Sequence, residues 1–178
     1  MSKKHYIITG LTLGVIAAAS AALIGVTNLV TKDRIAKNEQ AKIQVGIVSI
    51  YGEDATIKEE RAIADYKYTN YVYEIESPAN APKFVFRTTG SNMYGKISML
   101  VGLNQDVSNN EFILVDVYLI TNEQTYASTL EENYIDSLNE GTRDLDDVSC
   151  GATYGAKLVR DMVEDAKTAA LEIYKRIY

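Results

Sequence analysis

The chain has 178 residues, a net charge of −6 and a pI near 4.9. These values argue against nucleic-acid binding, which requires a basic face. One cysteine rules out an intrachain disulfide, and the single histidine, His5, lies in the N-terminal tail, so no Cys/His metal cluster and no Ser-His-Asp triad is expected. We predict no metal site and no catalytic residues. Redox chemistry would have to come from a bound organic cofactor.

An uncharged run covers residues 6–30 and follows Lys3 and Lys4. Because about 20 apolar residues cross a bilayer, this run predicts a transmembrane helix. A cleaved signal peptide is the alternative, since Ala17-Ala18-Ala19 resembles a cleavage site. The apolar run continues well beyond the roughly 7–15 residues of a signal-peptide core, so a retained membrane anchor is predicted.

Small residues recur at every fourth position of this helix, at Gly10, Gly14, Ala18 and Ala22. Such a stripe lets a second membrane helix approach closely, which fits a subunit of a membrane complex. The alternative is that glycine and alanine are simply common in membrane helices, and the two interpretations remain open.

The next segment, residues 31–44, is charged and is predicted to continue the helix out of the bilayer. Residues 46–56 are interpreted as a connection and residues 57–64 as a short helix. Three parts are predicted: a tail and transmembrane helix (1–31), a juxtamembrane helix and connection (32–60), and a globular domain (61–178).

Strand-like segments dominate the first half of that domain. Tyr71, Tyr73 and Ile75 alternate with Val72, Glu74 and Glu76, as in a half-buried strand. Further strands are predicted at residues 83–88, 97–103 and 112–120, with a turn at residues 77–80. Short turns between them predict an antiparallel sheet, with the terminal helix packed on one face. The expected class is α+β.

Helices are predicted in the second half of the domain. Residues 131–138 form a short helix, residues 142–149 an acidic loop, and residues 154–178 a long amphipathic helix. Its predicted core positions, at helical spacing, are Leu158, Met162, Val163, Ala166, Ala170 and Ile173.

The turn that opens this last helix reads Asp147-Val148-Ser149-Cys150-Gly151-Ala152-Thr153. A helix N-terminus presents unpaired N–H groups and the positive end of the helix dipole, which together favour a phosphate or another anion. The Thr153 hydroxyl would lie where the phosphate rests. The alternative is that Ser149 or Thr153 simply caps the helix.

This string resembles the Asp-x-x-(Ser/Thr)-Gly-Ala-(Thr/Ser) signature of the FMN-binding domain in the G subunit of Rnf electron-transport complexes. The C subunit of the sodium-pumping NADH:quinone oxidoreductase has a similar one. The resemblance implies that a flavin transferase esterifies FMN, through its phosphate, to Thr153. Gly151 and Ala152 also match, whereas Cys150 stands where the family has Ser or Thr. We expect Cys150 to be a buried apolar residue without a redox role.

Two further stretches resemble the same family. Residues 90–102, with Tyr94-Gly95, are similar to its glycine-bearing hairpin, and residues 115–125 to the strand before its Glu-Thr-Pro-Gly-Leu-Gly loop. Here that loop reads Gln124-Thr125-Tyr126-Ala127-Ser128, without the glycines and proline. Gln124 and Thr125 are candidate hydrogen-bond partners of the flavin. Tyr94, Tyr126 and Tyr154 are candidates for stacking on its ring.

The predicted function is that of a membrane-anchored flavoprotein carrying electrons through covalent FMN. The resemblance implies a G-type subunit of an Rnf-like, ion-translocating ferredoxin:NAD oxidoreductase, rather than an enzyme complete in itself. It also implies a short cytoplasmic tail, an extracytoplasmic domain, and other membrane subunits as partners. One alternative is a stand-alone extracytoplasmic FMN electron carrier or reductase. Another is a flavin-free, membrane-tethered binding domain.

Overall fold

The computed structural model describes residues 3–76, 82–106, 108–109 and 111–177. The turn predicted at residues 77–80 lies outside these ranges. The chain forms two compact units, Met1–Ala41 and Lys42–Tyr178. Each is described by itself below.

Helix α1 covers Lys3–Tyr51. Its stretch Gly10–Thr27 is long and apolar enough to span a membrane. The large apolar side chains there are exposed and are not covered by other parts of the protein. Leu11, for example, is 70% exposed. Near the end of this stretch the Thr27 hydroxyl donates a hydrogen bond to the Leu23 carbonyl at 2.8 Å. Bonding to the helix's own backbone satisfies a polar group without water. The N-terminal apolar helix predicted from the sequence is confirmed.

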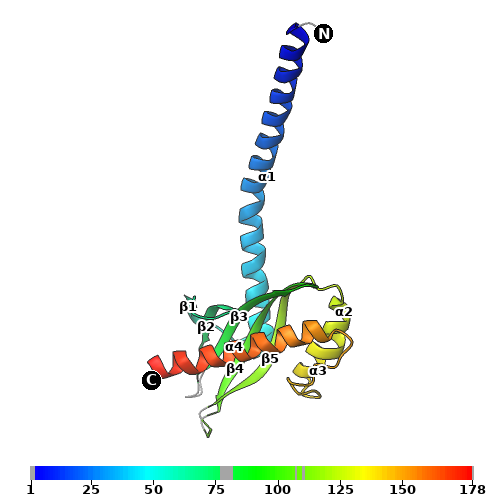
Figure 1. The fold of residues 1–178 in the computed structure, drawn as a ribbon. Helices are drawn as coiled ribbons and strands as arrows, with labels where there is room; N and C mark the ends of the chain where they lie inside the picture. Colours follow the sequence, from blue (N-terminus) through cyan, green and yellow to red (C-terminus); the bar gives the residue numbers. More distant parts are fainter. Residues whose placement is uncertain (1–2, 77–81, 107, 110, 178) are drawn as a thin grey trace. The chain divides into compact units, whose positions relative to one another are not determined.

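The second unit is built on one antiparallel sheet, in the order β1-β2-β3-β4-β5, so that every strand pairs with its neighbour in sequence (Figure 1). The strands are β1 (Ile57–Ala62), β2 (Thr69–Ile75), β3 (Lys83–Asn92), β4 (Gly95–Asp106) and β5 (Glu111–Asn122). The β3–β4 hairpin is in continuous register from Lys83↔Asn104 to Asn92↔Gly95. The α+β class and the antiparallel sheet are confirmed.

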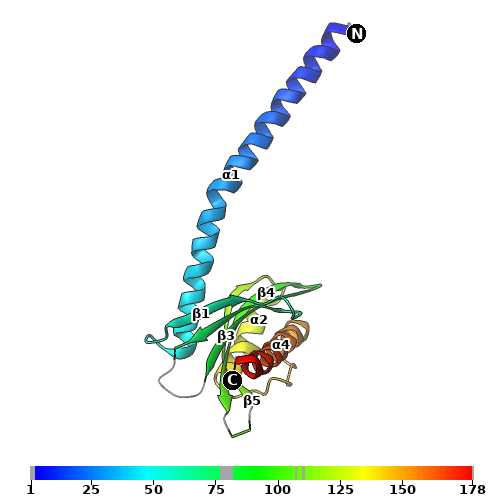
Figure 2. The same ribbon diagram turned by 90° about the vertical axis from the view of Figure 1, so that its left-hand side faces the viewer.

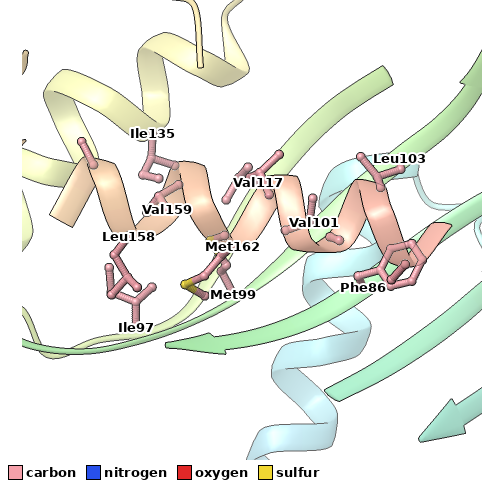
Figure 3. Packing of buried hydrophobic residues seen from close by; sticks show 14 of the residues in the cluster. Phe86, Ile97, Met99, Val101, Leu103, Val117, Ile135, Leu158, Val159 and Met162 are labelled. Carbon is pink, nitrogen blue, oxygen red and sulfur yellow. The ribbon is translucent and has the colours of Figure 1, made fainter. Parts of the chain in front are cut away.

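One face of the sheet is covered by helix α4 (Thr153–Ile177), which runs along it (Figures 1 and 2). Figure 3 shows Leu158, Val159 and Met162 of α4 over Ile97 and Met99 of β4. All five side chains are buried, as are the other predicted core positions of the helix. The predicted packing of the terminal helix on the sheet is therefore confirmed.

The opposite face of the sheet is also covered, by the last residues of α1. Ile43, Ile47 and Ile50 form a second core with residues that include Tyr73 and Leu100. The interpretation of residues 46–56 as a connection is therefore wrong at its start, because α1 continues without a break to Tyr51. Burial of one face of the helix stabilises it by more than the glycine in its interior, Gly46, destabilises it.

A second correction concerns residues 57–64: the first six of them, Ile57–Ala62, form strand β1, and no helix occurs there. Their sequence, rich in Lys, Glu and Arg, suits a helix by intrinsic propensity. Pairing with β2 overrides that preference, and Glu74 of β2 forms ion pairs with both Lys58 and Arg61. The charged side chains also protect this edge strand from pairing with other chains.

Between β5 and α4 the chain forms a helical segment made of α2 (Ala127–Leu130), a π-helical turn η1 (Glu131–Ile135) and α3 (Asp136–Asn139). The short helix predicted at residues 131–138 lies within it. Leu130 and Tyr134 are fully buried in the core shared with α4. This contact brings the segment against the start of α4.

Candidate functional site

A cavity of about 200 Å³ lies where three segments of the second unit meet. They are the tip of the β3–β4 hairpin, the loop between β5 and α2, and the first turn of α4. The residues lining it are Tyr94, Gln124, Tyr126, Leu130, Gly151, Ala152, Thr153, Tyr154 and Gly155. None of these carries a charge at neutral pH.

Hydrogen bonds tie the loop to the hairpin tip. The Thr125 N–H donates to the Tyr94 carbonyl at 2.9 Å, and the Gln124 side-chain Nε2 donates to the Gly95 carbonyl at 2.6 Å. The contact requires glycine at position 95, because its φ is +139° and a Cβ there would lie 2.0 Å from the Glu123 carbonyl oxygen. Two segments far apart in sequence thus form one wall of the cavity.

A side-chain bridge ties the hairpin to α4. The Asn92 Nδ2 donates to the Tyr154 carbonyl at 3.0 Å, and the Asn92 Oδ1 accepts the Tyr94 N–H at 2.8 Å. The rings of Tyr94 and Tyr154 are consequently close, with centroids 5.2 Å apart and planes inclined by 34°. The two tyrosines form an aromatic side of the cavity.

The first turn of α4 has no side-chain cap at its cap position. The Ala152 carbonyl accepts the N–H of Ala156 at 3.0 Å, so Ala152, and not Ser149 or Thr153, is the residue that precedes the first turn. Alanine has no side-chain acceptor for the N–H groups of that turn, which point outward from a helix start. Thr153, Tyr154 and Gly155 of this turn line the cavity.

The loop before α4 is fixed by Asp147. Its carboxylate accepts the Ser149 N–H at 3.3 Å and pairs with Arg143 at 3.0 Å. Arg143 also donates to the Asp147 carbonyl at 2.9 Å. Gly151 follows with a φ of +86°, a conformation that glycine adopts without strain. Asp147 therefore acts on the site by shaping the loop.

Six of the eight predicted site residues line the cavity: Tyr94, Gln124, Gly151, Ala152, Thr153 and Tyr154. The other two do not. The Thr125 hydroxyl is exposed and donates to the Tyr94 carbonyl at 3.2 Å. Cys150 is only 7% exposed and belongs to the core beneath the loop, as expected of a buried apolar residue. Tyr126, weighed as a stacking residue, lines the cavity and is 56% exposed.

Gly155 and Leu130 are lining residues that the sequence analysis missed. A Cβ on Gly155 would lie 2.9 Å from the Leu130 Cδ2 and 3.5 Å from the Gln124 Oε1. The missing side chain therefore leaves the floor of the cavity open. A glycine inside a helical pattern was the available signal. Among the described residues, no group of acidic, histidine or cysteine side chains is placed to hold a metal ion.

In a comparison with protein-family models, residues 1–45 match the model described as the RnfG N-terminal region. The match covers the apolar helix and ends before the residues of the cavity. Comparison with curated proteins gave no match.

Proposed function

We propose that the chain is an RnfG-family protein, which the match of residues 1–45 supports, and that it carries FMN on Thr153, joined through a phosphoester, and passes electrons through it. In this proposal it is the G-type subunit of an Rnf-like, ion-translocating ferredoxin:NAD oxidoreductase. The observation that carries the proposal is the cavity that brings Thr153 together with three tyrosines and an uncapped helix start.

Thr153 suits this attachment because it is the first residue of α4. A phosphoryl group on its hydroxyl oxygen would lie within the first turn, where N–H groups and the helix dipole favour negative charge. Ala152 leaves those donors without a competing side-chain acceptor. Gly151 and Gly155 keep the backbone on either side of Thr153 accessible.

The size of the cavity bears on how a flavin would be held. Pockets that enclose drug-sized ligands measure roughly 300–1,000 Å³, whereas this cavity measures about 200 Å³. Part of a bound flavin would therefore lie outside, at a rim formed by Tyr126 and Tyr154, which are 56% and 59% exposed. A partly exposed ring suits exchange of electrons with another protein.

When bound, FMN supplies the electron-transfer chemistry. The share of this chain is to hold it. The helix start would compensate the charge of the phosphate, and Tyr94 and Tyr154 would offer aromatic faces to the ring. The lining residues themselves are uncharged, and the Lys157 ammonium lies 5.9 Å from the centroid of the Tyr154 ring. Covalent attachment keeps the cofactor from being lost when the domain faces the outside of the cell.

The proposed partners are the other membrane subunits of the complex and the flavin transferase that completes the protein. The apolar helix would anchor the chain, with the short N-terminal tail in the cytoplasm and the domain outside. The stripe of Gly10, Gly14, Ala18 and Ala22 provides a face on which another membrane helix could pack closely.

Intact-protein mass spectrometry tests the proposal on full-length protein made in a host that has the flavin transferase. We expect an added mass of FMN less one water, because the phosphoryl group replaces the hydroxyl hydrogen of Thr153. Thr153→Ala should lose this mass and Thr153→Ser should retain it. Thr125→Ala is the matched control, since it removes a neighbouring hydroxyl that does not line the cavity. A bare wild-type polypeptide would favour the flavin-free alternative.

One observation favours a stand-alone electron carrier as the second candidate. Residues 127–130 form helix α2 where the resembled family has a glycine-rich loop. Copurification from native membranes separates the two candidates. A complex subunit would be recovered with other integral membrane proteins in a fixed ratio, whereas a stand-alone carrier would be recovered alone and loaded with FMN.

A further inference from the structure

Gln124 is a polar side chain buried in the wall of the cavity. It is 7% exposed and lies in the loop after β5. Its backbone N–H donates to the Asn122 Oδ1 at 3.2 Å, and its Nε2 donates to the Gly95 carbonyl at 2.6 Å. The second bond fixes the orientation of the amide, because the reverse orientation would set two oxygens against each other.

This orientation leaves the Gln124 Oε1 toward the floor of the cavity. The oxygen lies 3.5 Å from the position that a Cβ on Gly155 would occupy. Among the described residues, no donor forms a hydrogen bond to it. An amide oxygen can accept two hydrogen bonds. The cavity therefore presents a fixed hydrogen-bond acceptor among lining residues that are mostly apolar or aromatic.

We propose that the Gln124 Oε1 accepts a hydrogen bond from the imide N–H of a flavin ring and so sets which edge of the ring enters the cavity. This inference rests on the proposed function and adds to it the position of the ring. The imide is the one N–H donor of the oxidised isoalloxazine, and it lies on the pyrimidine edge. That edge is thus the inner one, and the dimethylbenzene edge faces the exposed rim at Tyr126.

Gln124 is a positioning residue in this account. Gly95 is its support, because the carbonyl of Gly95 holds the amide in place. Gly155 is the neighbour that leaves the oxygen accessible. Three separate segments therefore cooperate to present a single acceptor, and none of them supplies it alone.

The test uses lumiflavin, which has the ring but no ribityl phosphate, and 3-methyllumiflavin, in which a methyl group replaces the imide hydrogen. Full-length protein with Thr153→Ala leaves the cavity free of covalent flavin. Binding is followed by quenching of flavin fluorescence. We expect the 3-methyl compound to bind about tenfold more weakly, as for the loss of one hydrogen bond to a buried acceptor.

When Gln124→Leu is combined with Thr153→Ala, the difference in affinity should disappear, so that lumiflavin and 3-methyllumiflavin bind almost equally tightly. Gln105→Leu is the matched control, because Gln105 is also buried but lies near the far end of β4; the tenfold difference should persist there. If 3-methyllumiflavin still bound about tenfold more weakly than lumiflavin to the Gln124→Leu protein, the proposal would be overturned. Failure of lumiflavin to bind at all would overturn it too.

A second comparison needs no change at Gln124 and applies if the leucine variant does not fold. 8-Chlorolumiflavin is altered on the dimethylbenzene edge and should bind as tightly as lumiflavin, whereas 3-methyllumiflavin should not. The reverse order would contradict the proposal. Since neither compound can be esterified to Thr153, these results are independent of the mass spectrometry that tests covalent attachment.

Discussion

A Cβ on Gly46 would lie 2.6 Å from the Cδ1 of Tyr118, so helix α1 meets strand β5 with no side chain of its own in between. The same close approach occurs from the sheet side, where a Cβ on Gly102 would lie 2.3 Å from the Cγ2 of Ile50. Two glycines, one on each element, thus allow the end of α1 to pack directly on the sheet.

Replacing Gly46 with valine should destabilise the domain. Helix propensity favours valine slightly over glycine, but the extra carbons would overlap Leu100 and Tyr118. Overpacking of this kind costs about 1–3 kcal/mol, so we expect the free energy of unfolding to fall by about 2 kcal/mol. Denaturant unfolding of the full chain in detergent measures it. Gly25→Val is the control, because nothing lies within 4 Å of that position; equal midpoints for the two variants would contradict the packing argument.

Gly151 and Gly52 make a matched pair for testing the loop before α4. Their φ values are +86° and +92°, so alanine should cost about 1–2 kcal/mol of stability at either position. Only Gly151 lines the cavity. We therefore expect Gly151→Ala to lower the fraction of chains that carry FMN, measured by intact mass, and Gly52→Ala to leave it unchanged. Equal loading of the two variants would show that the shape of this loop does not matter for attachment.

Tyr134 gives the domain a dependence on alkaline pH. Its hydroxyl donates to the Leu145 carbonyl, and burial raises the pKa of this phenol well above its ordinary value of 10.0. The folded state therefore holds the proton more tightly than the unfolded state. Tyr134 contributes its full stability below about pH 10, and the contribution falls as the pH rises above that value. Burial raises the pKa of Tyr73 to about 12, which adds a loss of the same sign.

The expected result for Tyr134→Phe has two parts. The variant should lose about 1 kcal/mol at pH 7, as for a missing hydrogen bond. Between pH 9 and about 11 its free energy of unfolding should then fall less steeply than that of the wild type, in a series of denaturant titrations. Tyr126→Phe, with an exposed ring, should follow the wild type throughout. Parallel curves for Tyr134→Phe and wild type would refute the role of this phenol.

The core of the domain could be predicted from sequence because its strands and last helix are long and strongly patterned. Residues 97–103 are almost wholly apolar, and they became part of strand β4, which lies between β3 and β5 and is buried on both faces there. The end of α1 could not be predicted in the same way. Gly46 ordinarily indicates a break, and only the contact with Tyr118 gives a reason for a glycine inside the helix. Strand β1 was missed because its charged residues favour a helix until β2 pairs with it.

The candidate site, like the fold, could be predicted from the sequence only in part. Local sequence was enough to identify the segment around Thr153, since a glycine-containing turn before an amphipathic run has a recognisable form. Leu130 was not identifiable, because its role depends on α2 packing against α4, and Gly155 gave only the signal of a glycine inside a helical pattern. The side chain of Thr125 was assigned to the cavity on resemblance, yet its hydroxyl bonds to the hairpin. Whether these residues line the cavity depends on contacts between elements that are distant in the sequence.

The uncharged lining of the cavity has a consequence for how the protein would respond to its surroundings. None of the described lining residues is an aspartate, glutamate, histidine, lysine or arginine. A redox group held there would take its pH response only from its own protonation steps. The pH dependence of its midpoint potential would therefore report on the cofactor itself and not on the titration of the cavity wall.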